Sequence, residues 1–505
     1  MIAYELVRPV DAHLREKAET LGTKISFHDA AESISFAALD ARTLSLATAL
    51  AARGVGPGDT VAIHVQNSVR WVEICLAVVR RGAVAVPISA DSSPDELFYR
   101  IADAGCVACF TSSRHAGFFA ESAARMPTLR TVVTMEEAAP LRETPADPAS
   151  AESEDLDAPA FILYTSGTTG RAKGVVLTQR SMLWVVAACW SPIAGLGPDD
   201  HMLAPLPLFH SYGLDLVVLG GLACGATVRI MERFSTDEAL ALLCGGDFTL
   251  LPVVPTMAHY LLERAPPGPL DFGRLRLSIS AGAIMPAALN LAFEERTKVP
   301  LIDGYGITET STMVTLNWPG RPRILGSCGF PVPGVSVRIV DPASRLDLAY
   351  GAAGELIVRG PNLMLRYHAK PEETAKALVD GWYLTGDLAR ADANGFLTIT
   401  GRLKEIIIRG GQNIAPAEIE ETAQNFPAVL DCAVVGRAHR FLGEVPVLFV
   451  VPRDEYGIDP DALRAFLGAH LSAYKVPEEI RPIPEIPRTG SGKIKRFELQ
   501  KLLGP

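Results

Sequence analysis

The sequence contains no long run of lysine or arginine, and acidic residues outnumber basic ones by 57 to 47, which gives a net charge of −10. A nucleic-acid-binding protein normally presents a basic face, so this composition predicts no nucleic-acid partner. Long hydrophobic runs are also missing. The longest uncharged stretch, residues 181–198, is interrupted by proline and glycine, and we expect a buried helix with its loop rather than a membrane span. The sequence begins without a basic segment followed by an apolar one, so we expect no signal peptide.

Cysteine is present, but not in the arrangement of a disulfide framework. The eight cysteines are scattered along the chain, which is typical of a protein kept in the reducing cytoplasm. Cys106 and Cys109 form a C-x-x-C pair at a predicted turn that enters a buried strand. No second pair and no histidine cluster accompanies them in the sequence, so we expect neither a metal site nor a redox site there.

The pattern of hydrophobic residues indicates an α/β protein. A chain of 505 residues is too long for one ordinary core, so we expect two or more domains. In the first third, predicted helices (residues 36–53 and 71–80) alternate with predicted strands (residues 58–65 and 83–88). This alternation favours helices layered on mostly parallel sheets.

Two later stretches mark the organisation of the rest. Residues 136–158 are rich in Ala, Pro, Glu and Asp, and we expect a mobile, acidic surface linker there. After Arg402, a new order of strand, helix, strand pair and helix is typical of a small α+β domain. We therefore predict a large N-terminal domain of layered sheets and helices over residues 1–402 and a small, mobile α+β domain over residues 403–505.

The most informative stretch reads Tyr-Thr-Ser-Gly-Thr-Thr-Gly-Arg-Ala-Lys-Gly, from Tyr164 to Gly174. The backbone N–H groups and hydroxyls of such a loop can surround phosphate oxygens, with Lys173 supplying positive charge. It is not a Walker A loop, because Ala172 stands where that motif needs glycine and Gly174 where it needs Ser or Thr. The expected phosphate contacts are Thr165, Ser166, Gly167, Thr168, Thr169, Gly170 and Lys173.

This loop resembles the signature loop of the adenylate-forming superfamily, which contains acyl-CoA synthetases, adenylation domains of nonribosomal peptide synthetases and firefly luciferase. Further motifs of that family follow in the same order, and the resemblance covers nearly the whole chain. It implies that ATP activates a carboxylic acid as an acyl-adenylate, with release of pyrophosphate, and that the acyl group then passes to the thiol of coenzyme A. In the family the loop holds the β- and γ-phosphates of ATP.

The stretch Asp303-Gly-Tyr-Gly-Ile-Thr-Glu-Thr310 resembles a highly specific nucleotide motif of that family. The resemblance implies that Tyr305 stacks on adenine, Thr308 contacts the α-phosphate and Glu309 helps to bind Mg²⁺, a hard cation that prefers carboxylate oxygen. A small-residue turn earlier in the chain resembles the segment that lies against the adenine. The implied nucleotide-binding residues of this turn and motif are Ala281, Gly282, Ala283, Asp303, Tyr305 and Gly306.

Motifs in the last quarter of the chain complete the resemblance. It implies that Asp387 binds both ribose hydroxyls, that Arg402 also contacts the nucleotide, and that Lys404 is the hinge between the domains. Gly410 and Gly411 would let a pantetheine arm pass close to the backbone during thioester formation.

The last motif runs from Pro487 to Arg496. Lys493 matches the catalytic lysine of the adenylation step, whereas we expect Lys495 and Arg496 to be surface charges. The implied catalytic residues of the whole chain are His210, Thr308, Glu309 and Lys493.

The acid-binding pocket is the least specified part of the site. The segment Pro207-Leu-Phe-His-Ser-Tyr-Gly213 resembles the one that opens the acyl pocket, where His210 would lie near the carboxylate. The predicted lining is Phe209, Tyr212, Asp215 and Leu216. It is mostly apolar, so we expect an aliphatic or aryl acid. Asp215 has two interpretations: an ordinary helix residue with a backbone or arginine partner, which we favour, or a counter-charge for a substrate ammonium group.

An acyl-CoA synthetase that uses ATP, Mg²⁺, coenzyme A and a small carboxylic acid is therefore the leading prediction. A stand-alone ligase that loads an acyl or β-amino acyl group onto the phosphopantetheine of an acyl or peptidyl carrier protein uses the same thiol chemistry. A non-catalytic acyl or nucleotide binder is a further alternative, but Lys173, Glu309, Asp387 and Lys493 argue against it. A phosphotransferase is the weakest option. Both a monomer and a homodimer are compatible with the sequence.

Overall fold

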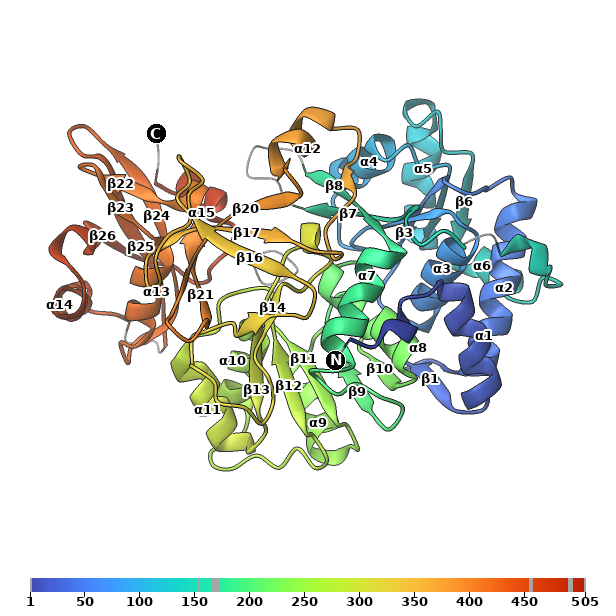
Figure 1. Cartoon of the computed structure of the whole chain (residues 1–505), viewed down its shortest axis with the longest axis horizontal. Coiled ribbons are helices and arrows are strands. Elements are labelled where there is room, and N and C mark those ends of the chain that lie inside the picture. Colours follow the sequence, from blue (N-terminus) through green and yellow to red (C-terminus); the bar gives the residue numbers. More distant parts are fainter. Residues whose placement is uncertain (1, 152–153, 166–171, 454–456, 489–493, 504–505) are drawn as a thin grey trace.

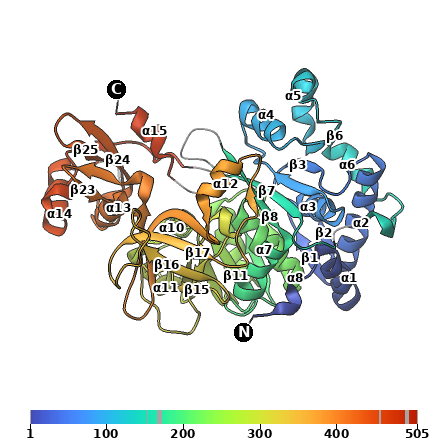
Figure 2. The same ribbon diagram turned by 45° about the horizontal axis from the view of Figure 1, so that its top comes forward.

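The computed structural model describes residues 2–151, 154–165, 172–453, 457–488 and 494–503. Within them, three sheets and their helices form a large N-terminal domain. A smaller C-terminal domain lies at one end of the molecule's long axis (Figure 1). The turned view shows the same separation (Figure 2). The predicted fold class, a large α/β domain followed by a small α+β domain, is confirmed.

The first sheet has seven strands in the order β18-β8-β7-β4-β3-β5-β6. Its strands are β3 (Thr60–His64), β4 (Val84–Pro87), β5 (Ala108–Thr111), β6 (Thr131–Thr134), β7 (Pro159–Thr165), β8 (Lys173–Thr178) and β18 (Arg366–Tyr367). The strands from β7 to β6 pair in parallel, as the alternation of helices and strands predicts. Strands β7 and β8 instead form an antiparallel pair, and the predicted phosphate loop connects them.

The second sheet has nine strands in the order β15-β14-β13-β12-β11-β9-β10-β1-β2. Its strands are β1 (Ile25–His28), β2 (Ser33–Ser35), β9 (His201–Ala204), β10 (Thr227–Ile230), β11 (Leu250–Val253), β12 (Leu277–Ser280), β13 (Leu301–Tyr305), β14 (Thr315–Leu316) and β15 (Phe330–Pro331). The strands from β1 to β13 pair in parallel, so the carboxyl ends of β12 and β13 open at one edge. Two of the segments predicted to bind the nucleotide follow these ends.

One hydrophobic core joins the two large sheets. Helix α3 (Val69–Arg80) lies within it, and eleven of its twelve residues are buried, including the charged Glu73 and Arg80. The other helices of the N-terminal domain are α1 (Val10–Leu21), α2 (Phe36–Ala52), α4 (Pro94–Asp103), α5 (Ala116–Ser122), α6 (Met135–Leu141), α7 (Gln179–Val185), α8 (Gly221–Cys224), α9 (Thr236–Gly245), α10 (Pro255–Arg264), α11 (Ala287–Thr297) and α12 (Pro371–Ala377). The shared core fixes the relative positions of the sheet edges that carry the predicted site.

A third sheet is antiparallel and leads to the C-terminal domain. It contains β16 (Ser336–Val340), β17 (Gly354–Arg359), β19 (Leu378–Val379), β20 (Trp382–Ala391) and β21 (Leu397–Arg402). The C-terminal domain contains β22 (Ile407–Arg409), β23 (Gln412–Ile414), β24 (Val429–His439), β25 (Gly443–Pro452) and β26 (Glu479–Pro482), with helices α13 (Pro416–Gln424), α14 (Pro460–His470) and α15 (Arg496–Lys501). Its sheet has two hydrophobic clusters of its own, separate from the main core. The small domain therefore has the core that an independent unit requires.

The predicted linker over residues 136–158 is wrong in part, because the stretch starts inside helix α6. A capping box begins this helix: the side chains of Thr134 and Glu137 bond to each other's backbone N–H groups. Arg142, which follows it, pairs with the buried carboxylate of Glu73 at 2.7 Å. The start of the acidic stretch is therefore anchored to α3.

All eight cysteines lie in the described residues as free thiols. Cys106 and Cys109 are buried at the start of β5, and burial raises the pKa of the Cys106 thiol to about 12, which disfavours the reactive thiolate. In the described part of the chain, every helix is too short or too polar to cross a lipid bilayer.

Candidate active site

Tyr305, Asp387 and Arg402 meet at one point, although three strands of two sheets carry them. The Tyr305 hydroxyl, at the end of β13, donates to Asp387 Oδ2 at 2.5 Å. Arg402 lies opposite Asp387 in the β20–β21 pair, and its Nε is 2.8 Å from Asp387 Oδ1. The carboxylate is buried and raises the pKa of Arg402. The Asp387 carboxylate is thus held between the Tyr305 hydroxyl and the Arg402 guanidinium, and the structure brings together three residues predicted to contact the nucleotide.

The turn after β13 brings Glu309 close to this group. A Cβ on Gly306 would lie 1.3 Å from the Thr312 carbonyl oxygen, so only glycine allows the chain to fold back there. Ser311 and Thr312 complete the turn with left-handed φ angles of 50° and 96°. The turn contains the short helix η7 (Thr308–Thr310), which carries the two residues predicted to contact the phosphates and Mg²⁺.

Asp303, in the middle of β13, points into the domain. It is buried, and Asn290 of α11 donates to its carboxylate at 3.3 Å. Burial raises the pKa of Asp303 well above its ordinary value. Its backbone carbonyl accepts from Asn317 Nδ2 at 3.2 Å. These contacts hold the end of β13 against α11, beneath Tyr305.

Glu309 and Lys173 are linked by one side chain, Tyr367. The Tyr367 hydroxyl donates to Glu309 Oε1 at 3.0 Å, and the Lys173 ammonium lies 5.0 Å from the centre of the Tyr367 ring. Lys173 also pairs with Glu373 of α12. The two charged residues predicted for the phosphate end are therefore close to one another.

Helix α4 holds both ends of the predicted phosphate loop. Tyr99 donates to the carbonyl of Ala172 at 2.8 Å, and Tyr164 donates to Asp103 at 2.7 Å. Thr165 ends β7, next to the loop. The predicted phosphate contacts Ser166, Gly167, Thr168, Thr169 and Gly170 lie outside the described residues, as does Lys493.

The small-residue turn follows β12 directly. Ala281 is buried, and Gly282 has a φ of 89° that favours glycine. Ala283 is exposed at the mouth of the turn. The Tyr212 hydroxyl donates to the Ile279 carbonyl at 2.9 Å, which ties the predicted acid pocket to the same strand.

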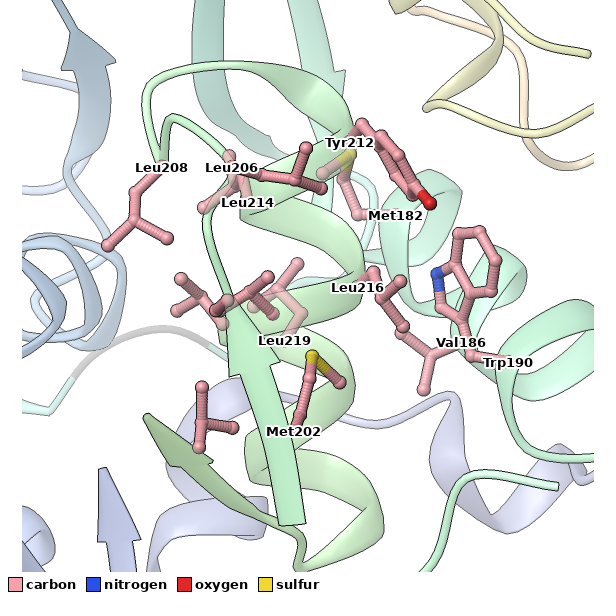
Figure 3. Close-up of a cluster of buried hydrophobic side chains, with 14 of the residues drawn as sticks. Met182, Val186, Trp190, Met202, Leu206, Leu208, Tyr212, Leu214, Leu216 and Leu219 are labelled. Atoms are coloured by element: carbon pink, nitrogen blue, oxygen red, sulfur yellow. The ribbon is translucent and has the colours of Figure 1, made fainter. Parts of the chain in front are cut away.

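Asp215 and Leu216, two residues predicted to line the acid pocket, lie in the π-helical segment η6 (Gly213–Gly220), which packs on a second one, η5 (Val186–Trp190). The Trp190 and Tyr212 rings stack with centroids 6.1 Å apart, and Leu216 is buried beside them (Figure 3). Phe209 and His210 precede η6 and are half-buried, with rings 6.0 Å apart. The side chains packed around Tyr212 and Leu216 are therefore mostly apolar.

Asp215 is the one ionisable side chain of η6. It is fully buried and accepts a hydrogen bond from the Trp190 indole N–H. The simpler interpretation predicts a backbone or arginine partner, but the partner is the Trp190 indole. Burial raises the pKa of Asp215 well above its ordinary value, which favours the neutral acid, and Oδ2 has no hydrogen-bond partner among the described residues.

The predicted hinge and thioester-stage residues lie in the C-terminal part. Lys404 is an exposed residue of the short helix η8 (Leu403–Glu405), which directly follows β21. Gly410 and Gly411 form the two-residue turn between β22 and β23, with left-handed φ angles of 57° and 81° that suit this turn type. Gly410 N–H donates to the Leu442 carbonyl at 2.7 Å, so the turn packs on its own domain.

Arg496 is not a surface charge, which corrects the prediction. Its guanidinium pairs with Glu405 at 2.9 Å and with Glu420 of α13, and it donates to the Val434 carbonyl at 2.8 Å. The two carboxylates raise the pKa of Arg496. The arginine therefore connects the end of the last motif to η8, which contains the predicted hinge residue Lys404.

Sequence reasoning missed Tyr367 and Glu373. Tyr367 belongs to a strand of two residues, which is too short to show a periodic pattern in the sequence. Its hydroxyl is 3.2 Å from that of Tyr383 on β20. Only the folded chain brings these side chains to Lys173 and Glu309.

Comparison with known proteins identifies the family. The AMP-binding enzyme model matches residues 14–368, and the AMP-binding enzyme C-terminal domain matches residues 418–493. A feruloyl-CoA synthase from Amycolatopsis is 35% identical, with 94% of each chain covered, and a sulfoacetate–CoA ligase from Cupriavidus necator is 36% identical, with 93% of each covered. The fold matches ATP-bound MatB from Rhodopseudomonas palustris with a TM-score of 0.92, at 30% identity over 99% of both chains, and the apo form with 0.81. The chain belongs to the AMP-binding enzyme family and, within it, to the AMP-forming acid–thiol ligases.

Proposed function

We propose that this enzyme converts an aryl or aliphatic carboxylic acid into its coenzyme A thioester, with the nucleotide held by Tyr305, Asp387 and Arg402. The observation that carries the proposal is the convergence of Tyr305 and Arg402 on the buried carboxylate of Asp387. Each carboxylate oxygen has two acceptor positions. After bonding to Tyr305 and Arg402, Asp387 keeps one position on each oxygen for the two ribose hydroxyls.

The adenine lies between the Tyr305 ring and the turn of Ala281, Gly282 and Ala283. A flat base needs a π-face on one side and close backbone on the other, and small residues permit the second contact. Thr308 then faces the α-phosphate, because it follows Tyr305 by one tight turn. The Tyr212 bond to β12 keeps the acid pocket next to this point.

Glu309 and Lys173 serve the triphosphate, together with the loop from Thr165 to Gly170. Among the described residues, no group of three or more His, Cys, Asp or Glu side chains is arranged to hold a metal ion. One carboxylate fits Mg²⁺ that arrives with ATP, since this ion keeps several waters and binds one or two carboxylates plus substrate phosphates. When bound, the ion supplies positive charge to the phosphates; Glu309 would hold it.

The chemistry has two steps. A carboxylate oxygen attacks the α-phosphorus of ATP, the bond to pyrophosphate breaks, and an acyl-adenylate forms. The coenzyme A sulfur then attacks the acyl carbon, the thiol proton is lost and AMP leaves. Lys493 and Thr308 stabilise the charge that builds at phosphorus in the first step, and His210 positions the acid.

The domain boundary falls between Arg402 and Leu403, and the small domain turns about Lys404 between the two steps. Support comes from the separate cores of the small domain and from η8, which joins it to β21. The higher TM-score with ATP-bound MatB than with its apo form supports an adenylation-ready arrangement here. After the turn, Gly410 and Gly411 face the pantetheine arm.

The acid is a neutral aryl or aliphatic one, because the described wall is apolar and Asp215 favours its neutral form. The two relatives named above act on acids as different as ferulate and sulfoacetate, so their names do not favour one class of acid over another for this enzyme. A carrier-protein thiol is the alternative acceptor, and transfer to free coenzyme A or to a phosphopantetheinylated carrier distinguishes the two.

The test is carboxylate-dependent ATP–pyrophosphate exchange without coenzyme A, across fatty acids, benzoates, cinnamates, dicarboxylates and β-amino acids. Exchange with aryl or aliphatic acids, followed by thioester formation when coenzyme A is added, is the expected result. Exchange confined to amino acids would overturn the acid assignment and favour Asp215 as an ammonium partner. Silence of folded, ATP-binding protein across the panel would overturn the activity.

A further inference from the structure

Tyr367 occupies a position between the two charged groups of the phosphate end. Its strand β18 pairs with β8 in the register Tyr367↔Val175, two residues after Lys173. The side chain is 6% exposed. Neither neighbour in sequence shares its environment: Arg366 is exposed, and His368 Nε2 bonds to the Asp103 carbonyl at 3.0 Å.

The two ends of the Tyr367 side chain have different contacts. The ring face lies 5.0 Å from the Lys173 ammonium, which is within the range of a cation–π contact. The hydroxyl donates to Glu309 Oε1 at 3.0 Å and lies 3.2 Å from the Tyr383 hydroxyl.

These contacts restrict where the two charges can go. Lys173 is the first residue of β8 and Glu309 lies in η7, so the two residues belong to separate elements and no shared backbone segment fixes their relative position. A carboxylate with one oxygen fixed by a buried phenol has its second oxygen oriented, and an ammonium that lies over a ring and pairs with Glu373 has few other positions open to it. The pair is thereby organised before a ligand arrives, which lowers the entropic cost of binding.

We propose that Tyr367 is a positioning residue that holds Glu309 and Lys173 in the arrangement that receives the magnesium-bound triphosphate of ATP. The inference rests on the proposed function, because it takes Glu309 and Lys173 as the phosphate-end groups. The hydroxyl acts on Glu309 and therefore on the metal. The ring acts on Lys173 and therefore on the phosphates themselves.

The experiment separates the hydroxyl from the ring. ATP binding is measured by calorimetry without any carboxylic acid, in EDTA and at rising Mg²⁺, for the wild type, Tyr367→Phe and Tyr367→Leu. The matched control is Tyr383→Phe, which removes a buried hydroxyl of the same cluster that bonds to Tyr367. Thermal unfolding confirms that each variant is folded.

Tyr367→Phe removes one charge-assisted hydrogen bond. We therefore expect the Mg²⁺ concentration that gives half-maximal enhancement of ATP binding to rise about tenfold, with metal-free ATP binding unchanged. Tyr367→Leu should also weaken metal-free binding, because the ring is gone. Tyr383→Phe should keep the wild-type Mg²⁺ response. Thioester formation from supplied acyl-adenylate and coenzyme A, which uses neither triphosphate nor Mg²⁺, should stay within about twofold for Tyr367→Phe.

The proposal is overturned if folded Tyr367→Phe has the wild-type Mg²⁺ response. It is also overturned if Tyr383→Phe shifts that response as much, or if Tyr367→Phe weakens metal-free binding and the thioester step equally, since Tyr367 would then be a general packing residue. Failure of the proposed function has another sign: the wild type would bind magnesium ATP yet show no carboxylate-dependent exchange.

Discussion

Replacing Asp387 with asparagine should weaken ATP binding much more than it weakens the fold. The substitution keeps the size and shape of the side chain and removes its charge. In the structure this carboxylate is 3% exposed, accepts from the Tyr305 hydroxyl at 2.5 Å and pairs with Arg402 at 2.8 Å. An asparagine amide offers one carbonyl oxygen, so it cannot serve Tyr305, Arg402 and both ribose hydroxyls together.

The magnitude follows from the number of charged hydrogen bonds lost. A hydrogen bond to a charged group is worth about 1.5–3 kcal/mol, so losing one such bond with full strength raises the dissociation constant of ATP roughly 10- to 150-fold. The fold loses less, because the Arg402 side chain is 38% exposed and water screens its ion pair. We expect the free energy of unfolding to fall by only about 1 kcal/mol.

Calorimetry with ATP and the Michaelis constant for ATP in the exchange reaction measure the first effect, and urea unfolding measures the second. Asp392→Asn is the matched control. Asp392 lies in the turn between β20 and β21, where its carboxylate accepts from the backbone N–H of Asn394 at 2.9 Å. An Asp387→Asn enzyme that binds ATP within about threefold of the wild type would refute the assignment of the ribose site.

Three further perturbations test other parts of the structure. Gly306→Ala should lower the free energy of unfolding by more than about 3 kcal/mol, because its Cβ would lie 1.3 Å from a backbone carbonyl oxygen. The control Gly117→Ala, in open space on α5, should change the free energy of unfolding by less than about 1 kcal/mol, and urea unfolding measures both. Burial lowers the pKa of His13 and of His64 from 6.5 to about 4, so the unfolded chain binds more protons between these values and stability falls as pH drops through this window. Between pH 7 and pH 5, each histidine should lower the free energy of unfolding by about 2 kcal/mol. His64→Gln should therefore lose correspondingly less stability than the wild type over this range, and an equal loss would contradict the reasoning. Lys493→Ala should slow pyrophosphate exchange about 100-fold or more and leave thioester formation from supplied acyl-adenylate largely unchanged. Equal loss of both steps would contradict the assignment of Lys493 to the adenylation step.

The parts of this protein that local patterns encode could be predicted from the sequence. Alternating helix and strand periods indicate the parallel sheets, and the composition after Arg402 indicates the small domain, both of which the structure shows. The nucleotide motifs also place Tyr305, Asp387 and Arg402 in one site, where the structure brings them together. Helix α6 is a different case: the sequence Thr-Met-Glu-Glu, from Thr134 to Glu137, is a capping-box signal that composition alone obscured.

The contacts that the sequence could not supply are those between distant segments. Arg496 resembles any surface arginine near a C-terminal helix until Glu405 and Glu420 fold against it. Tyr367 likewise belongs to a strand of two residues, and its importance arises from where β18 meets β8. Such side chains become recognisable only when the tertiary structure supplies their partners.

The two ends of the site differ in how strongly they constrain a ligand. At the nucleotide end, directional groups from separate strands converge on Asp387 and Glu309, and a ligand that lacks their partners leaves buried polar groups unpaired. At the acid end the described wall is apolar, and an apolar wall separates acids that differ by one methylene by only about 1–3 kcal/mol. Discrimination beyond that must come from the few polar groups there, which include His210 and also Asp215, bonded to Trp190 and buried in η6. On the proposed function, the acid is therefore selected mainly by the residues around η5 and η6 and not by the nucleotide end.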